Sequence, residues 1–492
     1  MLPLFVVLPL FCAFLSVILS KFKKIYYEVL VNIINFVLVV LAFYLLYLLN
    51  ISTNKYFIYQ VGGHKFPIGI SMYVDFFSVF MLLFVNIIGF FVGLYSVNYM
   101  EKYTEKGKFY SLFELMITGM NGIIISGDLF NIFVFLEIAS VASYALVAFG
   151  TESDELEASF KYLVLSSIAS SFIFLGIILT YSYTSTLNLI DISNSLGQSQ
   201  EYIVKIILLI FFLGFSIKAA LVPFHSWLPD AHTSAPTPVS AILSGVLIKT
   251  LGVYLIVRFV YNVFPSNLIM LKIIQYLGLL SMIVGSILMI YQWDYKRLLA
   301  YSSISQVGYI LLGIGLATPL SIIGSVLHLI NHSFIKSLLF LTSGSLEYVF
   351  KTRNLKELSN FELPRNKTMP ITNFSAIIGS LSIAGIPPLN GFWSKLVLII
   401  ACVIAKDFIS AIIAILVSIL ALSSFLKVLK YAFYSTYENQ EKLINNIEKK
   451  EVPFLMQLSM LSLSVFCILM GLLLYPDVRK VLMENIVNVF IK

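Results

Sequence analysis

Residues 203–229 read IVKIILLIFFLGFSIKAALVPFHSWLP, and this stretch decides the fold class. An α-helix needs about 20 consecutive apolar residues to cross the hydrocarbon core of a bilayer. The run has that length, but it contains Lys218 and is interrupted by Pro223. Proline frees backbone groups that hydrocarbon cannot satisfy, so we expect this break to face protein or water inside a membrane protein.

The composition extends this interpretation to the whole chain. Of the 492 residues, 59% are hydrophobic and 12% are charged, and the mean hydropathy is +0.94. The charged fraction is about half that of an ordinary soluble domain, so a water-facing surface cannot be built from it. The net charge of +7 fits the loop lysines and arginines of a membrane protein better than a surface that binds nucleic acid.

The apolar segments predict an all-α integral membrane protein with about 14 transmembrane helices. They lie at residues 2–20, 27–49, 72–98, 109–126, 129–149, 158–182, 203–228, 237–262, 268–291, 298–317, 319–345, 371–404, 407–436 and 455–475. The first segment is followed by its lysines instead of preceded by them. We therefore expect a retained helix there, not a cleaved signal peptide.

Two of these helices are interrupted, which predicts an internal repeat. Helix 7 breaks at residues 219–229, and helix 12 breaks at residues 385–393, which read GIPPLNGFW. Broken helices in corresponding positions indicate a transport path. Because an offset of five helices inverts the topology, we predict two inverted five-helix repeats. The predicted organisation is helices 1–3 in residues 1–98, helices 4–8 in 109–262, helices 9–13 in 268–436, and helix 14 with a short surface tail in 455–492.

Loop charges predict the orientation in the membrane. If the N-terminus is outside, the inward loops hold roughly 16 Lys and Arg residues, against roughly 7 on the other side, and positively charged loops stay in the cytoplasm. We therefore expect a multi-pass protein of the cell membrane with both termini on the outer face. After Pro476, the spacing of the apolar residues predicts a short helix on the membrane surface.

Three charged residues lie deep inside the apolar segments. Burying a charge in a bilayer costs at least a few kcal/mol, so such residues mark ion or proton paths. Glu137 lies within segment 129–149, Lys218 within helix 7 and Lys249 within helix 8. A buried amine is costly to keep charged, so it can gain and lose a proton during turnover. Glu137 also fits a structural role as the partner of a buried lysine, and the two roles are compatible.

Helix 11 carries His328, His332 and Lys336 at positions i, i+4 and i+8. This spacing places all three side chains on one face of the helix, which favours a proton relay. Two histidines at i and i+4 can also bind zinc, but no glutamate follows the first and no third ligand is evident. We therefore expect a relay and no metal site.

Other charged residues have less specific interpretations. Glu114 and Lys161 fit either a buried role or a helix end. The remaining cations lie near segment ends, where their side chains can extend to the membrane interface. They are Arg258, Lys272, Lys427 and Lys430.

The sequence offers no redox or nucleotide site. Cys12, Cys402 and Cys467 lie singly in apolar runs, so they cannot assemble an iron–sulfur or zinc site. A glycine-rich phosphate loop after a strand pattern is also missing. We expect no cofactor, no catalytic residue, and no oxidoreductase activity in the isolated chain.

Several motifs resemble a known family, the antiporter-like proton-translocating subunits of respiratory complex I. Within it, the chain is most similar to the D subunit of Mrp sodium/proton antiporters and its counterpart in membrane-bound, energy-converting NiFe hydrogenases. The motifs are GDLFNIFVFLE at 127–137, HSWLPDAHTSAPTPVSA at 225–241, DYKRLLAYSSISQVGY at 294–309, HLINHSFIK at 328–336 and IPPLNGF at 386–392.

The resemblance implies a fold, partners and roles. It implies a subunit of a hetero-oligomeric membrane complex that moves H⁺, and it leaves open whether Na⁺ is exchanged and which complex is formed. The implied proton path comprises the Glu137–Lys218 pair, the second central lysine Lys249, the helix 11 relay and the helix 12 lysine Lys395. At about 6 Å and an effective dielectric constant near 20, one unit charge biases another by roughly 2–3 kcal/mol. Movement of Glu137 would therefore switch the lysine between holding and releasing its proton.

Two other functions compete with ion translocation inside a complex. A stand-alone secondary transporter of a small solute also uses broken helices, but the polar residues here form a line of titratable groups and not a cluster suited to a solute. A passive scaffold does not explain buried charges. Identifying the proteins that copurify with the chain would separate these functions.

Overall fold

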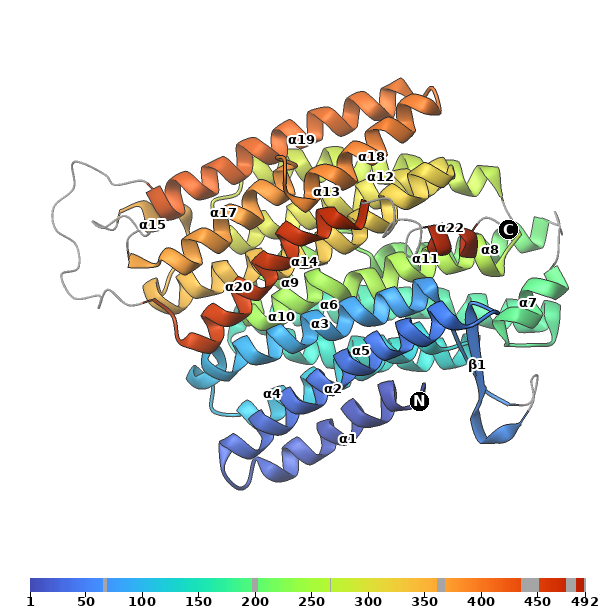
Figure 1. Ribbon diagram of the computed structural model, residues 1–492, viewed down its shortest axis with the longest axis horizontal. Coiled ribbons are helices and arrows are strands. Elements are labelled where there is room, and N and C mark those ends of the chain that lie inside the picture. The colour runs from blue at the N-terminus through green and yellow to red at the C-terminus, as the bar shows by residue number, and fades with distance from the viewer. Residues whose placement is uncertain are drawn as a thin grey trace.

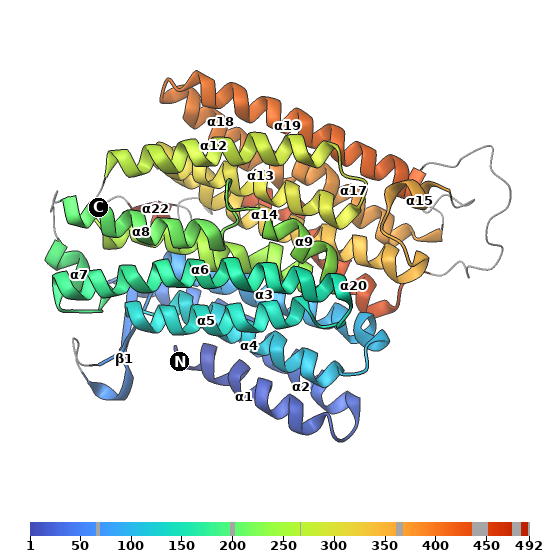
Figure 2. The same ribbon diagram turned by 180° about the vertical axis from the view of Figure 1, so that it is seen from behind.

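The computed structural model describes residues 1–64, 69–196, 202–265, 267–360, 368–434, 451–474 and 484–490. Within them the chain forms a bundle of long helices that run side by side, with their connections at its two ends (Figure 1, Figure 2). Ten of the described helices are long and apolar enough to cross a membrane, and three shorter apolar helices accompany them. The predominantly helical, multi-pass membrane fold is confirmed, and the count of 14 crossings stays a prediction.

The N-terminal part consists of three helices and a β-hairpin. Its elements are α1 (Leu4–Leu19), α2 (Lys24–Ile51), β1 (Tyr56–Gln60), β2 (Ser71–Asp75) and α3 (Phe76–Tyr99). The strands pair antiparallel, with Tyr56 opposite Asp75. We predicted helix from residue 72, but the first residues of that segment form β2. Helix α3 begins only at Phe76 because the Asp75 carboxylate caps it, accepting a 3.0 Å hydrogen bond from the Ser78 backbone N–H.

The predicted break in helix 7 is present. Helix α8 ends at Lys218 and the chain resumes as a helix at Trp227. The region that follows, predicted as one helix, contains three π-helical segments, η3, η4 and η5. The elements of this part are α4 (Lys106–Ile125), α5 (Leu129–Val147), α6 (Ser153–Thr184), α7 (Leu189–Leu196), α8 (Tyr202–Lys218), α9 (Trp227–Ser234), α10 (Thr237–Ile242), η3 (Leu243–Leu247), η4 (Lys249–Tyr254), α11 (Leu255–Arg258) and η5 (Phe259–Val263).

The predicted break in helix 12 is also present. Helix α17 ends at Ala384, Gly385 adopts a positive φ of 87°, and α18 begins at Asn390. The elements of this part are α12 (Leu268–Ile290), α13 (Tyr295–Leu316), α14 (Pro319–Phe350), α15 (Leu355–Ser359), α17 (Pro370–Ala384), α18 (Asn390–Ile404), α19 (Phe408–Leu429) and η6 (Lys430–Tyr434). The chain continues with α20 (Phe454–Leu469), η7 (Met470–Leu474) and α22 (Asn485–Phe490).

Matching backbone contacts relate the two halves as repeats. Asp128 caps α5 and forms an isolated β-bridge with Asn188, and Asp294 caps α13 and forms one with Asn354. The two pairs have the same spacing along the chain. Short helices follow these bridges, α7 in the first half and α15 in the second, and they lie at opposite ends of the bundle (Figure 1, Figure 2). The opposite placement of equivalent elements is the property of inverted repeats.

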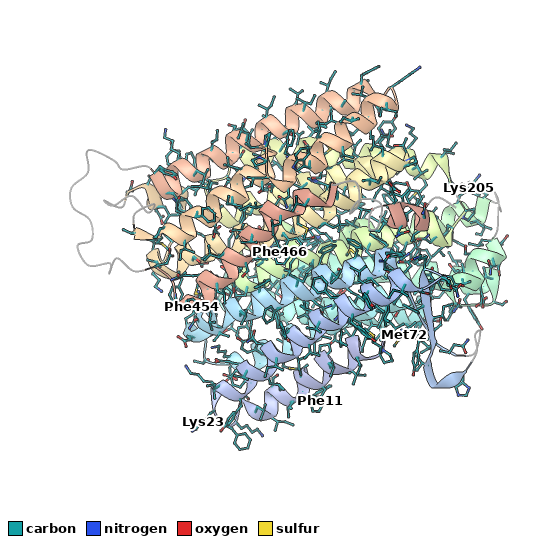
Figure 3. All side chains as sticks on the ribbon, in the orientation of Figure 1. Phe11, Lys23, Met72, Lys205, Phe454 and Phe466 are labelled. Carbon is teal, nitrogen blue, oxygen red and sulfur yellow. The ribbon has the colours of Figure 1, made fainter. Side chains whose placement is uncertain are left out.

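The innermost helices include the two segments that carry Lys249 and the predicted relay of α14, whereas α5, which carries Glu137, is less buried. The most apolar window of the segment Thr237–Val263 is completely buried, and those of α13 and α14 are 94% buried. The corresponding values are 33% for α2, α6 and α20, which therefore lie at the periphery. Apolar side chains cover the outside, as expected for contact with lipid, and in Figure 3 Lys23 and Lys205 mark opposite ends of the bundle.

The C-terminal helix contacts protein. The Phe490 ring of α22 lies 5.0 Å from the Phe77 ring and 5.6 Å from the Tyr261 ring, and the Asn262 side chain donates a 2.6 Å hydrogen bond to the Val489 carbonyl. We predicted that Val489 and Phe490 belong to a helix on the membrane surface. The described part of the tail packs on α3 and η5, and its position at the membrane surface stays a prediction. Residues 475–483 of the predicted tail lie outside the described residues.

Gly252 allows the end of α8 to approach η4. A Cβ atom at Gly252 would lie 2.4 Å from the Ala219 Cβ and 2.6 Å from the Ala219 backbone nitrogen. We expect Gly252→Ala to lower the free energy of unfolding by about 1–3 kcal/mol, the usual cost of overpacking. Thermal unfolding of the purified protein would measure the change.

Gly89→Ala in α3 is the matched control. The nearest atom to its new Cβ is the flexible end of Ile117, at 3.0 Å, and alanine favours a helix by up to about 1 kcal/mol over glycine. We expect an equal or higher melting temperature. A Gly252→Ala variant as stable as the Gly89→Ala variant would contradict the close approach.

Candidate functional site

Glu137 and Lys218 lie beside each other, as predicted. The Lys218 Nζ is 4.0 Å from the Glu137 Oε1. It donates hydrogen bonds to the hydroxyls of Ser140 at 2.8 Å and Ser166 at 2.6 Å, and the Ser170 hydroxyl donates to Glu137. The Lys218 side chain is 1% exposed and the Glu137 side chain is 36% exposed. The pair therefore consists of a buried amine and a carboxylate that is partly exposed at the surface of the bundle.

Lys249 is buried on the π-helical segment η4. Its Nζ donates hydrogen bonds to the carbonyls of Ser244 at 2.7 Å and Gly245 at 2.6 Å. Within the described part of the chain, no carboxylate forms an ion pair with it. Single π-helical turns occur often at functional sites, and here the neighbouring turn η3 supplies the acceptors for the amine.

His328, His332 and Lys336 lie along one face of α14 and are all buried. The two imidazole rings are 6.1 Å apart with their planes 6° from parallel. The His328 Nδ1 is 2.9 Å from the Ser394 hydroxyl, and the Lys336 Nζ donates to the Leu299 carbonyl at 2.7 Å. Neither ring nitrogen of His332 has a hydrogen-bond partner among the described residues.

Lys395 reaches back across the break in helix 12. Its Nζ donates a 2.7 Å hydrogen bond to the Ile383 carbonyl, in the last turn of α17. The same Nζ lies 5.1 Å from the centre of the Tyr309 ring, and that ring is 5.4 Å from the His328 ring. The break therefore brings Lys395 close to the histidines of α14.

The structure divides the seven predicted residues into two groups, the Glu137–Lys218 pair and the other five. The charges of Lys249 and Lys395 act electrostatically on both His328 and His332, and Lys249 also acts on Lys336. These residues share one electrostatic network. Among the described residues, no hydrogen bond or ion pair links that network to the Glu137–Lys218 pair.

Sequence reasoning missed His232 of α9. It is completely buried, its ring lies 4.6 Å from the Phe340 ring, and neither ring nitrogen has a hydrogen-bond partner among the described residues. The charges of Lys336, Lys296 and Lys249 act on it. The sequence feature that could have pointed to His232 is its position between the break of helix 7 and Pro236.

Lys296 was also misread, because we counted it as an inward loop charge. It is 1% exposed, and its Nζ is 2.9 Å from the Glu347 Oε2. Glu114, for which two interpretations remained open, is completely buried and accepts a 2.7 Å hydrogen bond from Asn35. Lys161 is half-exposed and pairs with Glu157.

Arg258 corrects a further interpretation, because its side chain does not extend to the interface. It is 6% exposed and forms a two-pronged ion pair with Asp75. The remaining N–H groups donate to the oxygens of Tyr254 at 3.1 Å, Asn262 at 3.2 Å and Ser78 at 2.7 Å. All five guanidinium donors are thus used. The partner was not visible from sequence because Asp75 lies far away in the chain.

The described residues contain no group of three His, Cys, Asp or Glu side chains close enough to hold a metal ion. Cys12, Cys402 and Cys467 are buried and free. The buried amines, imidazoles and carboxylates described above are groups that can exchange protons.

Inverted repeats, two broken helices and a line of buried titratable side chains together define a class of multi-pass membrane protein. Residues 126–423 match the model of the transmembrane region of the NADH:quinone oxidoreductase/Mrp antiporter family. Residues 60–110 match the model of the N-terminus of chain 5 of NADH-ubiquinone oxidoreductase, complex I. The chain belongs to the NADH:quinone oxidoreductase/Mrp antiporter family.

Relatives from several kinds of complex are similar to the chain. It is 33% identical over 400 residues to the D subunit of the Na⁺/H⁺ antiporter of Alkalihalophilus pseudofirmus, and the match covers 80% of each protein. It is 34% identical over 381 residues to the N subunit of the NADH-quinone oxidoreductase of Desulforudis audaxviator, covering 76% of this chain and 75% of that protein. A chain of the membrane-bound sulfane sulfur reductase, an archaeal respiratory membrane complex, superposes with a TM-score of 0.89 at 27% identity, covering 100% of this chain and 98% of that one.

The Arg258–Asp75 pair generates a prediction about stability. Arg258→Ala leaves a buried carboxylate without its counter-ion, which typically costs about 3–5 kcal/mol. Asp75→Ala likewise leaves the buried guanidinium of Arg258 without its counter-ion. We expect the double variant to lose less stability than the sum of the two single variants, as measured by thermal unfolding in a double-mutant cycle. Additive losses would show that the two side chains do not stabilise each other.

Proposed function

We propose that this chain is an ion-translocating subunit of a multisubunit membrane complex and moves protons through buried lysine, histidine and glutamate side chains. The observation that carries the proposal is the 4.0 Å Glu137–Lys218 pair, followed by the buried Lys249, which has no carboxylate partner among the described residues. Buried titratable residues in membrane proteins mark ion and proton paths. Family membership supports the same function.

The pair can act as a switch. At about 4 Å and an effective dielectric constant of 20, two unit charges interact by about 4 kcal/mol. The Glu137 side chain is 36% exposed, so screening reduces this value. A displacement of the carboxylate would still change how firmly Lys218 holds its proton. Protons then pass through Lys249 and the α14 face to Lys395.

We further propose the setting in which this happens. The chain lies in the cell membrane with both termini on the outer face, so that the α15 end of the bundle faces inward. Its partners are other membrane subunits, and its transported ions are H⁺ and, in an antiport cycle, Na⁺. The names of the relatives, which include an antiporter subunit and a respiratory complex, support these partners. Any redox chemistry belongs to those partners.

A stand-alone transporter of a small solute is the alternative function. It requires a solute cavity at the broken helices. A cavity of about 340 Å³ lies instead beneath the β-hairpin and is lined by residues such as Tyr73, Asn194 and Asn488, none of which belongs to the proposed path. A solute in this cavity would therefore not contact the residues of the proposed path.

Replacing Lys218 tests the proposal. We expect Lys218→Ala and Glu137→Ala to reduce ion gradient formation by the intact complex about a hundredfold or more, because positioned proton-transfer groups contribute factors of about 10²–10⁴. A pH-sensitive dye in membrane vesicles would report the gradient, and copurification would show that the complex assembles.

Lys272→Ala is the matched control. Lys272 is an exposed lysine near the start of α12 whose amine is bound to Gln275 at 3.0 Å. We expect this variant to build a normal gradient. A normal gradient in Lys218→Ala would contradict the proposed path, and copurification of no other subunit would contradict the proposed complex.

A further inference from the structure

Another ion pair, between Glu347 and Lys296, lies at the α15 end of the bundle, outside the seven predicted residues. Glu347, near the end of α14, accepts hydrogen bonds from Tyr99 of α3 and Thr237 of α10, both at 3.2 Å. Lys296 of α13 contacts the same carboxylate at 2.9 Å and donates to the Ala235 carbonyl at 3.2 Å. Four segments of the bundle therefore meet at one carboxylate.

Exposure falls steeply from Glu347 inward. The Glu347 side chain is 21% exposed, the Lys296 side chain is 1% exposed, and His232 is completely buried. One carboxylate thus separates the outside of the α15 end from a buried amine. A proton that enters from this end and reaches Lys296 meets Glu347 first.

His232 continues the series toward the proposed path. Lys296 is bonded to the carbonyl of Ala235, the residue that ends α9, and His232 lies in the last turn of α9. Both nitrogens of its ring are without a hydrogen-bond partner among the described residues. The charge of Lys296 acts on this ring, and so do the charges of Lys249 and Lys336, which belong to the proposed path.

We propose that the Glu347–Lys296 pair is the proton port of the α15 end, which takes protons from water and delivers them through His232 to Lys249 and Lys336. This port rests on the proposed function, because it supplies the path described there. The species that it binds is a proton brought by hydronium or by a small buffer acid.

The proton count balances in each cycle. In the resting pair Glu347 is a carboxylate and Lys296 is an ammonium. The ammonium leaves Glu347, turns inward and gives one proton to a free nitrogen of His232, which becomes an imidazolium. Glu347 takes one proton from hydronium and passes it to the neutral amine, which restores the pair. One proton enters at the surface and one leaves toward Lys249.

Other charged groups face Glu347 and set its surroundings. Besides Lys296, the charges of Lys102, three residues after the end of α3, and Arg353, after α14, act on it. The Arg353 Nη1 lies 3.9 Å from Glu347, and Lys102 donates to the Tyr99 hydroxyl at 3.3 Å. These cations also fit a purely structural strut between α13 and α14, so the test must separate a port from a strut.

Glu347→Gln separates the two roles through its pH profile. The amide keeps the shape and an acceptor for Lys296 but cannot carry a proton. We expect gradient formation by the intact complex to fall about tenfold or more at neutral pH. The residual rate should rise about tenfold for each unit by which the pH on the α15 side is lowered, because hydronium then protonates the path directly. The wild-type rate should stay flat over the same range, and vesicles of both orientations give access to each side.

Three further variants complete the experiment. Glu347→Asp should restore a flat pH profile at a reduced rate, because it restores a carboxylate. Glu357→Gln removes an exposed carboxylate of α15 at the same end and should behave as wild type. Lys296→Arg keeps the ion pair but cannot release a proton, so it should block transport in an assembled complex.

Each result has one meaning. A wild-type rate in Glu347→Gln or Lys296→Arg would overturn the port. A uniformly slow Glu347→Gln variant with a flat pH profile, or failure of both variants to assemble, would make the pair a strut and also overturn it. If Lys218→Ala in the same vesicles transports normally, the proposed function itself fails, and that outcome is distinguishable from failure of the port alone.

Discussion

The cost of holding an ammonium group inside an apolar bundle is the constraint on which the rest of this structure depends. Three of the buried lysines, Lys249, Lys336 and Lys395, have no carboxylate partner among the described residues, and backbone carbonyls take that place. Lys249 uses carbonyls of a π-helical turn, and Lys395 uses a carbonyl at the end of a broken helix. Irregular backbone is tolerated at membrane depth where it is buried in protein. At Lys249 and Lys395 the irregular backbone therefore supplies the acceptors that the buried amines need.

The two repeats use equivalent positions in different ways. Counted from their capping residues Asp128 and Asp294, equal distances along the chain relate three pairs of positions. These are Glu137 and Ser303, Ser166 and His332, and Ser170 and Lys336. The first repeat thus has a carboxylate and two hydroxyls around Lys218, while the second has a hydroxyl and two basic groups. At these positions one half therefore holds an ion pair, and the other holds bases that have no carboxylate partner among the described residues.

The sequence predicted what depends on local pattern. Long apolar runs, prolines within them and the spacing of His328, His332 and Lys336 indicated the spans, the breaks and the α14 face. It failed where a partner lies far along the chain: Arg258 looked like a helix-end cation because Asp75 is remote, and Lys296 looked like a loop charge because Glu347 is remote. The π-helical turns around Lys249 were also invisible, because an apolar segment has the same composition in either helical form.

Repulsion among the buried bases limits how many can carry a proton together. Lys249 acts electrostatically on Lys336, and both act on His232 and His332. In a medium of low dielectric constant, like charges at short range oppose each other by several kcal/mol. A proton that arrives at one of these groups therefore raises the cost of keeping one on the next. Ordered, one-at-a-time occupancy of these bases follows, whereas at the Glu137–Lys218 and Glu347–Lys296 pairs the neighbouring charge has the opposite sign.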